Sequence, residues 1–261
     1  MLGIDFFVGT AAEAIAHISK YGGLIVAPAA PSFIALQDDP DYRRAIADAD
    51  LAIADSGWAV LFWRLLRREK LSRISGLALF KALLETADAR IPGNLFFILP
   101  SEKAKTIEFG RALNLPITAD DCYVAPRYFS CSHGSVSREE RERVSQKRGY
   151  SIADDALVAI LQSRKPKHII IGIGGGMQDK LGSYLKHQLT YRPGIYCIGA
   201  APGFVTGDQI VIPMWADRFF VGWIFRIIDR PRDYLTRYWK ARFLPLLIIK
   251  YGTEIPQLRT S

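Results

Sequence analysis

A glycine-rich segment follows a short apolar run in the second half of the chain. The run His168–Ile171 leads directly into Gly172-Ile-Gly174-Gly175-Gly176-Met177-Gln178-Asp179. Glycines between a strand and a helix allow backbone N–H groups to approach a phosphate at the helix N-terminus. A tight strand-to-helix turn without any ligand explains the same glycines equally well. The segment therefore indicates either a phosphate-binding loop or a structural turn.

This glycine segment differs from the dinucleotide-binding fingerprint in two ways. The fingerprint needs a small residue where Met177 stands, and it needs an acidic residue at the end of a second strand about 20 residues later. The chain has neither feature. A nicotinamide or flavin enzyme is therefore nearly excluded, whereas binding of a nucleotide or a sugar nucleotide stays open.

Two aspartate segments are candidates for chemistry. Asp55 follows an apolar run and precedes Ser56-Gly57, and from the residues alone the N-cap of the next helix is the favoured interpretation. Asp39-Pro40-Asp41 matches the Asp-x-Asp motif with which some sugar transferases hold a metal ion, but a turn that caps a helix is the favoured interpretation. The histidines have no zinc-ligand spacing, and no nucleophile elbow occurs. The sequence therefore predicts no metal site.

Short β-rich runs alternate with helical patterns along the chain. Strands are predicted at residues 23–28, 50–54, 94–99, 168–173 and 194–198, and helices near 10–20, 32–46, 57–68, 76–88, 102–112, 152–163 and 176–188. This alternation favours an α/β fold with a mostly parallel, Rossmann-like sheet flanked by helices. Because ligands in such folds bind outside the carboxyl ends of the strands, we expect the site at the loops around 27–31, 55–57, 172–178 and 199–207.

The composition is that of a globular protein with a basic surface. The 261 residues include 34 Lys and Arg against 26 Asp and Glu, a net charge of +8. Three cysteines without metal-ligand spacing favour a reducing compartment and exclude a disulfide scaffold. We expect neither a signal peptide nor a membrane span, because no stretch reaches about 20 uncharged apolar residues.

Much of the positive charge lies near the C-terminus. Residues 214–251 contain eight basic and three acidic side chains, and aromatic residues recur there at helical spacing. This pattern suits a helix on the surface of an anionic bilayer, but packing of the aromatics on the protein explains it about equally well. No nucleic-acid-binding motif accompanies the charge. A second basic cluster follows the apolar helix pattern Trp58–Leu66 and consists of Arg64, Arg67, Arg68, Lys70 and Arg73.

Five segments match, in order, the motifs of one known family. They are Asp50-Leu-Ala-Ile-Ala-Asp55-Ser-Gly57, Arg73-Ile-Ser-Gly76-Leu-Ala-Leu79, Gly172-Ile-Gly174-Gly175-Gly176-Met177-Gln178-Asp179-Lys180, Ile198-Gly199-Ala-Ala-Pro-Gly-Phe204-Val-Thr-Gly207, and the C-terminal Pro213, Trp223, Arg226 and Pro231. Over nearly its whole length the chain resembles the WecG/TagA/CpsF glycosyltransferases. These enzymes transfer N-acetylmannosamine, its uronic acid or related sugars from UDP to lipid-linked acceptors.

The resemblance implies an inverting, UDP-sugar-dependent hexosyltransferase that needs no metal cofactor. Asp55 is then the catalytic base, and Arg73 stabilises the departing UDP. The implied substrate-binding residues are Gly172, Gly174, Gly175, Gly176, Gln178, Asp179, Gly199, Arg226 and Arg237. Among them, Gln178 would contact the nucleotide and Arg237 the diphosphate of the acceptor. Asp179 is also explained by the helix dipole, which favours an acid in the first turn.

The resemblance also implies how the protein is organised and where it works. Residues 1–208 form the α/β glycosyltransferase core, and residues 209–261 form a C-terminal amphipathic helical appendage that associates with the membrane. The expected location is peripheral, on the cytoplasmic face of a bacterial inner membrane. The expected partners are the UDP-sugar, a polyprenyl-diphosphate-linked acceptor and the anionic bilayer surface, without nucleic acid. Formation of a homo-oligomer stays open.

Four polar positions of the family pattern are changed in this chain. Ala27, Ala29, Ala78 and Gly203 stand where the family has side chains that contact the sugar or the acceptor. Two interpretations stay open as a result. The chain either uses a different donor sugar, or it is a non-catalytic, membrane-bound subunit derived from the same family.

Overall fold

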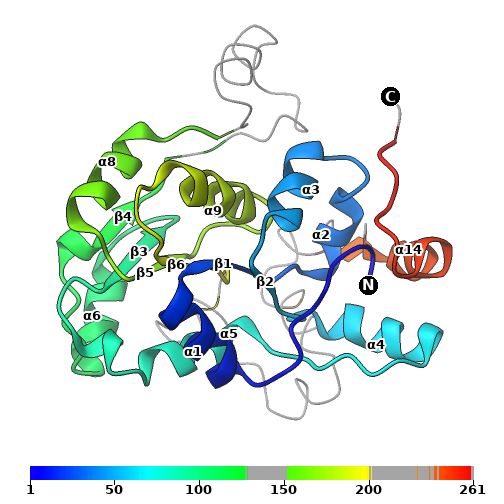
Figure 1. Cartoon of the computed structure of the whole chain (residues 1–261), viewed down its shortest axis with the longest axis horizontal. Coiled ribbons are helices and arrows are strands. Elements are labelled where there is room, and N and C mark those ends of the chain that lie inside the picture. The colour runs from blue at the N-terminus through cyan, green and yellow to red at the C-terminus, as the bar shows by residue number, and fades with distance from the viewer. Residues whose placement is uncertain are drawn as a thin grey trace, which may run out of the picture.

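A computed structural model of the chain describes residues 1–126, 128, 152–199, 201, 228, 235, 238–239 and 241–259. Its centre is a six-stranded parallel sheet in the order β2-β1-β6-β5-β3-β4 (Figure 1). In chain order the strands are β1 Gly23–Val26, β2 Leu51–Ala52, β3 Leu95–Leu99, β4 Cys122–Val124, β5 His168–Ile171 and β6 Gly194–Cys197. The predicted parallel α/β fold is confirmed.

Helices cover both faces of this sheet. On one face lie α2 Ala30–Ala35, α3 Pro40–Ala47, α4 Gly57–Arg67, α8 Asp155–Arg164, α9 Met177–Gln188 and α14 Leu244–Tyr251. On the other face lie α1 Ala11–Tyr21, α5 Gly76–Leu84 and α6 Ala104–Ala112, together with the short 3₁₀ helix η1 Asp88–Arg90; a second one, η2 Ala119–Asp121, precedes β4. Successive residues of β3 alternate between the two hydrophobic clusters, as the period of a strand requires.

Two elements differ from the sequence-based expectation. The single helix expected at 32–46 is two helices, because Asp39 has an extended backbone and caps α3, which begins at Pro40. Strand β4 was not predicted, since it has three residues and lies at the edge of the sheet. The other predicted strands and helices are present, with ends that differ by a few residues.

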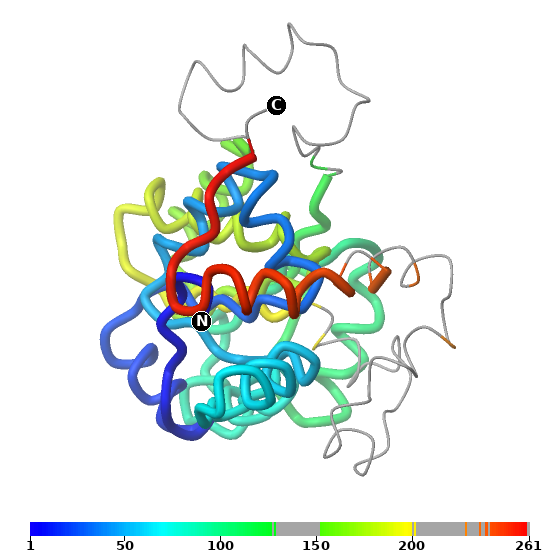
Figure 2. The backbone as a smooth tube through the Cα atoms, turned by 90° about the vertical axis from the view of Figure 1, so that its right-hand side faces the viewer, coloured from blue at the N-terminus to red at the C-terminus, as the bar shows by residue number. Residues whose placement is uncertain are grey.

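The described C-terminal residues pack into the core. Ala241, Leu244 and Ile248 are fully buried in the same cluster as α2 and α4. The N-terminal residues hold this segment in place, since Leu2 N–H donates to Gly252 O at 2.8 Å and Gly3 N–H donates to Thr253 O at 2.9 Å (Figure 2). The expected boundary between residues 208 and 209 lies outside the described residues. Within those residues no helix is long and apolar enough to cross a bilayer.

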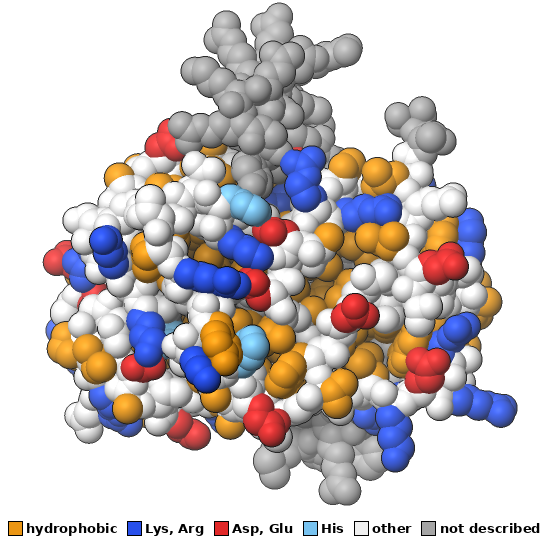
Figure 3. All heavy atoms as spheres, viewed as in Figure 1, with side chains coloured by type: hydrophobic (Ala, Val, Ile, Leu, Met, Phe, Trp, Pro, Cys, Tyr) orange, Lys and Arg blue, Asp and Glu red, His pale blue; other side chains and the backbone are white. Residues whose placement is uncertain are grey.

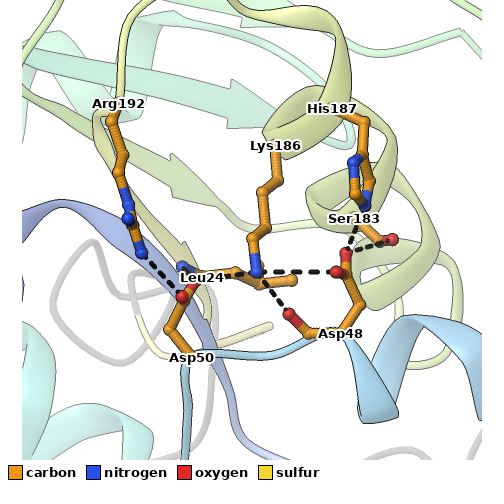
Figure 4. A network of polar contacts seen from close by, with 7 residues as sticks. All are labelled: Leu24, Asp48, Asp50, Ser183, Lys186, His187 and Arg192. Carbon is orange, nitrogen blue, oxygen red and sulfur yellow. Dashed lines mark hydrogen bonds and ion pairs between the residues drawn. The ribbon is translucent and has the colours of Figure 1, made fainter.

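A network of hydrogen bonds and ion pairs stabilises the amino-terminal edge of the sheet (Figure 4). Asp50 accepts hydrogen bonds from Leu24 N–H at 2.7 Å and from Arg192 at 2.8 Å, and it pairs with Lys186 at 3.0 Å. Burial opposes ionisation of Asp50, but the hydrogen bonds from Leu24 and Lys186 outweigh it and lower the pKa of the carboxyl. Asp48 binds Ser183 and His187 beside it. The network joins the end of α9 to the start of β1 and β2.

Candidate active site

The loops that follow four neighbouring strands meet at the carboxyl edge of the sheet. Val26 of β1 is in register with Ala52 of β2 and with Cys197 of β6, and Cys197 is in register with Ile171 of β5. The strands therefore end side by side. The loops selected from the sequence all begin at this edge, where ligands of open parallel sheets bind.

Asp55 lies in the loop after β2, and its carboxylate contacts the start of α5. Asp55 Oδ1 accepts a hydrogen bond of 3.0 Å from Gly76 N–H. Ser56, not Asp55, caps α4, because its hydroxyl accepts the N–H of Ala59. The alternative assignment of Asp55 as the N-cap of the next helix is therefore wrong. The contact with α5 fixes the orientation of a half-buried carboxylate at the positive end of a helix dipole.

Arg73 is attached to the same loop. Its Nε donates a hydrogen bond of 3.0 Å to the backbone carbonyl of Asp55. The arginine and the carboxylate therefore occupy one small region, although they lie 18 residues apart. The side chain of Arg73 is partly exposed, and its guanidinium lies against the loop that carries the Asp55 carboxylate.

Gly76 also joins this region to the end of β6. A Cβ atom at this position would lie 3.3 Å from Ile198 O and 3.6 Å from Ala201 Cβ. The segment Arg73–Leu79 and the segment that begins at Ile198 are more than a hundred residues apart, and they pack against each other at the backbone of Gly76. A larger residue at position 76 would push them apart.

The glycine loop after β5 is open on one side. Gly172 N–H continues the sheet by donating to Ile98 O at 2.8 Å, and Gly176 has a φ of +85°. A Cβ at Gly174 or at Gly176 would meet no atom of the described residues within 4 Å. Gly174 and Gly175 are exposed. The loop therefore has room for a ligand beside its backbone, at the N-terminus of α9.

Gln178 connects the glycine loop with the end of β6. Its side chain is buried, and Nε2 donates to Cys197 O at 3.2 Å. Within the described ranges the other amide atom, Oε1, has no hydrogen-bond partner. It faces Gly199, whose φ is +57° and whose Cβ would lie 3.3 Å away. An unpartnered buried acceptor is rare in proteins, and this one lies between the glycine loop and the end of β6.

Asp179 lies beneath the glycine loop and is buried. Its Oδ2 accepts Gly176 N–H at 3.1 Å, whereas Oδ1 has no hydrogen-bond partner among the residues that the structure describes. Burial raises the pKa of this carboxyl to about 7, against the weaker effects of the hydrogen bond from Gly176 N–H and the charge of Lys180. Asp179 therefore supports the loop from inside instead of facing solvent.

A buried ion pair next to Asp179 was not apparent from the sequence. Lys180 Nζ lies 2.6 Å from Asp39 Oδ2, and Asp39 Oδ1 accepts Tyr42 N–H as the cap of α3. The two charged residues are 141 positions apart, so no local spacing could have linked them. The Asp39-Pro40-Asp41 motif is thus a helix cap whose carboxylate also pairs with α9. Across the described part of the chain no three His, Cys, Asp or Glu side chains gather as metal ligands would.

The remaining predicted site residues cannot be placed. Arg226 and Arg237 lie outside the described residues, as does most of the segment that follows Gly199. The described residues bring Asp55, Arg73, the glycine loop, Gln178 and Gly199 to one edge of the sheet.

The fold and this edge define a class of protein. A parallel α/β sheet with an open glycine loop, a fixed carboxylate and an adjacent arginine is typical of enzymes that act on phosphorylated or nucleotide-linked substrates. The sequence model of the Glycosyl transferase WecG/TagA/CpsF family matches residues 1–255, and the chain belongs to this family. Membership makes it a glycosyltransferase of polysaccharide biosynthesis. A search of curated proteins finds no match.

Proposed function

We propose that the chain transfers a sugar from a UDP-sugar to a polyprenyl-diphosphate-linked saccharide with inversion at the anomeric carbon. The observation that carries this proposal is the fixed carboxylate of Asp55 beside Arg73 at the carboxyl edge of the sheet. The donor sugar is N-acetylmannosamine, its uronic acid or a related hexose. Ala27 and Ala29, at the end of β1, distinguish the donor side of this chain from the family pattern.

The proposed role of each residue follows from its position in the candidate site. The acceptor hydroxyl oxygen attacks the anomeric carbon, Asp55 takes the hydroxyl proton, and the bond between that carbon and the UDP oxygen breaks. The departing diphosphate gains negative charge. Arg73 and the N–H groups of the loop Gly172–Gly176 stabilise this charge without rearrangement of solvent. Gln178 Oε1 accepts a hydrogen bond from the nucleotide, and Gly199 leaves the space for it.

The protein acts at the cytoplasmic face of a bacterial inner membrane, bound peripherally to the anionic surface through its C-terminal region. Arg226 helps to bind the diphosphate of the donor, and Arg237 contacts the diphosphate of the acceptor. No metal ion takes part in this mechanism, so EDTA should leave the rate unchanged.

Release of UDP tests the proposal. A panel of UDP-sugars is incubated in EDTA with a short-chain prenyl-diphosphate-linked N-acetylglucosamine, and UDP is measured. Asp55→Asn is the critical variant, because its amide oxygen still accepts the Gly76 N–H while the side chain can no longer accept a proton as a base. Asp120→Asn, an exposed residue of η2 at the opposite edge of the sheet, is the matched control.

We expect release with one donor, dependent on the acceptor, unchanged in Asp120→Asn and reduced at least about a hundredfold in Asp55→Asn. Full activity of Asp55→Asn would remove Asp55 from the mechanism. No release with any donor, together with no binding of UDP by calorimetry, would favour a non-catalytic membrane-bound subunit.

A further inference from the structure

Helices α4 and α14 lie side by side on one flank of the molecule (Figures 1 and 2). The ring of Trp58 at the start of α4 is 6.4 Å from that of Tyr238, which precedes α14. At the other end, the guanidinium of Arg67 lies 3.1 Å from the place where a Cβ of Gly252 would stand. The two helices therefore run in the same direction and end together.

Helix α14 is apolar on two sides. Leu244, Leu247 and Ile248 face the core, whereas Leu246 and Ile249 are 62% and 60% exposed. A surface helix of a soluble domain normally turns polar residues toward water. The outer side of α14 is therefore an apolar surface without a partner in the described structure.

The last turn of α4 extends this apolar surface. Leu65 is 64% exposed and Leu66 is 39% exposed, and every residue from Arg64 to Lys70 is exposed. Two adjacent helices thus present aliphatic side chains to solvent on one flank. Exposed aliphatic side chains gathered on one flank mark an interaction site more often than isolated exposed leucines do.

Cations surround these aliphatic side chains. They are Arg64, Arg67, Arg68, Lys70, Arg242 and Lys250, and residues 64–70 and 241–252 contain one acid, Glu69. Arg242 stacks over Trp239 with its guanidinium carbon 3.8 Å from the ring centroid. The space-filling view shows basic side chains projecting at the lower right, near α4, and hydrophobic ones at the right-hand edge, near α14 (Figure 3).

The charge distinguishes between possible occupants of this surface. A second copy of the chain placed face to face would bring two sets of cations together, and like charges disfavour that contact. An anionic bilayer satisfies both features, because its headgroups pair with the cations while its acyl boundary receives the leucines and isoleucine.

We infer that α4, the residues Arg68–Lys70 that directly follow it, and α14 together form one bilayer-docking surface. This inference rests on the membrane association in the proposed function and names the element that shares it. Helix α4 begins next to Asp55 and has 11 residues, so it spans about 16 Å at 1.5 Å per residue. If the C-terminal end of α4 docks on the bilayer, Asp55 at its N-terminal end lies about one length of α4 from the headgroup region that holds a lipid-linked acceptor.

Co-sedimentation of the full chain with liposomes tests this inference. The liposomes are equimolar phosphatidylglycerol and phosphatidylcholine, with pure phosphatidylcholine as the neutral comparison, each at low and high salt. One variant removes apolar surface from α4, Leu65→Gln with Leu66→Gln. Another reverses charge, Arg68→Glu with Lys70→Glu.

Matched controls come from the opposite side of the molecule. Ile160→Gln removes an exposed aliphatic side chain from α8. Lys165→Glu with Arg111→Glu reverses two exposed cations; Lys165 ends α8 in the same left-handed conformation in which Arg68 ends α4. Thermal unfolding of each variant confirms that it is folded.

We expect binding to anionic liposomes that weakens with salt, and a loss of about tenfold or more in partitioning for each α4 variant but not for the controls. If the wild type binds and both α4 variants bind equally well, α4 has no role in docking. The proposed membrane association would then still stand. No binding by the wild type would overturn both. Loss of a dimer in the α4 variants, without loss of liposome binding, would assign the surface to a second copy and overturn the inference.

Discussion

The Asp55 carboxylate and the Gly76 N–H are joined by a hydrogen bond of 3.0 Å across 21 residues of sequence. The bond attaches the loop after β2 to the first residue of α5. Gly76 in turn lies against the end of β6. One small residue therefore sets the position of the candidate base relative to two other loops of the site, so the geometry of Asp55 depends on backbone contacts as well as on its own rotamer.

Two glycine substitutions should separate packing from ligand binding. Gly76→Ala places a methyl group 3.3 Å from Ile198 O, so we expect a loss of about 1 kcal/mol in the free energy of unfolding and a lower kcat. The methyl group of Gly174→Ala meets no atom within 4 Å in the described part of the chain, so its melting temperature should stay unchanged while KM for the donor rises. Thermal unfolding and donor titrations check both variants. Equal melting temperatures for the two variants would contradict the close contact at Gly76.

Asp50→Ala should weaken the fold without changing the chemistry. Asp50 belongs to the same motif as Asp55 but binds Leu24 N–H and Arg192 at the opposite edge of the sheet. Loss of this partly buried acceptor should lower the free energy of unfolding by about 2 kcal/mol. Urea unfolding measures the loss, and kcat/KM of the folded enzyme should match the wild type. A hundredfold fall in kcat/KM would show that Asp50 serves the site directly.

Asp179→Asn should stabilise the protein at alkaline pH. The folded-state pKa of about 7 exceeds the unfolded value near 3.9, so between these values the folded chain holds more protons and its stability falls as pH rises. The full effect is about 4 kcal/mol of unfolding free energy above pH 7. The variant keeps an acceptor for Gly176 N–H but cannot ionise. Its advantage over wild type should therefore be larger at pH 8 than at pH 5, and an equal advantage at both would contradict the titration.

His168→Gln should reduce the sensitivity of the fold to acid. Burial lowers the pKa of His168 to about 4, despite the opposing charge of Asp88, and its Nδ1 lies 2.9 Å from Tyr196 Oη. A base with a lowered folded pKa gives stability that is complete above the unfolded pKa near 6.5 and is lost as pH falls toward 4, about 3 kcal/mol in all. Urea unfolding from pH 7 to 4 should show a smaller loss for the variant. The exposed His17→Gln should follow the wild-type curve.

The sequence was sufficient to predict the architecture because the signals were local. Apolar runs such as His168–Ile171 and capped helices such as α4 can be identified from neighbouring residues alone. In a parallel sheet the strand ends converge, so the meeting of the Asp55, Gly172–Gly176 and Gly199 loops followed from the predicted order of strands and helices. The short edge strand β4 carried too little pattern to be found.

The contacts within the site could not be predicted in the same way. The hydrogen bond from Gly76 to Asp55, the ion pair of Asp39 with Lys180 and the unpartnered oxygen of Gln178 depend on how distant segments pack. No spacing along the chain encodes them. The same holds for α14, in which the buried Leu244, Leu247 and Ile248 and the exposed Leu246 and Ile249 are all apolar, so the sequence does not show which side faces the core.

The pairing of Leu2 and Gly3 with Gly252 and Thr253 has a consequence for biosynthesis. About 250 residues separate the two segments, so this contact has a very large sequence separation and is expected to form late in folding. While the chain is still emerging from the ribosome, the cluster that receives α14 lacks its final layer. The flank formed by α4 and α14 therefore becomes complete only after translation of α14, so the proposed docking on a lipid surface would follow completion of the chain.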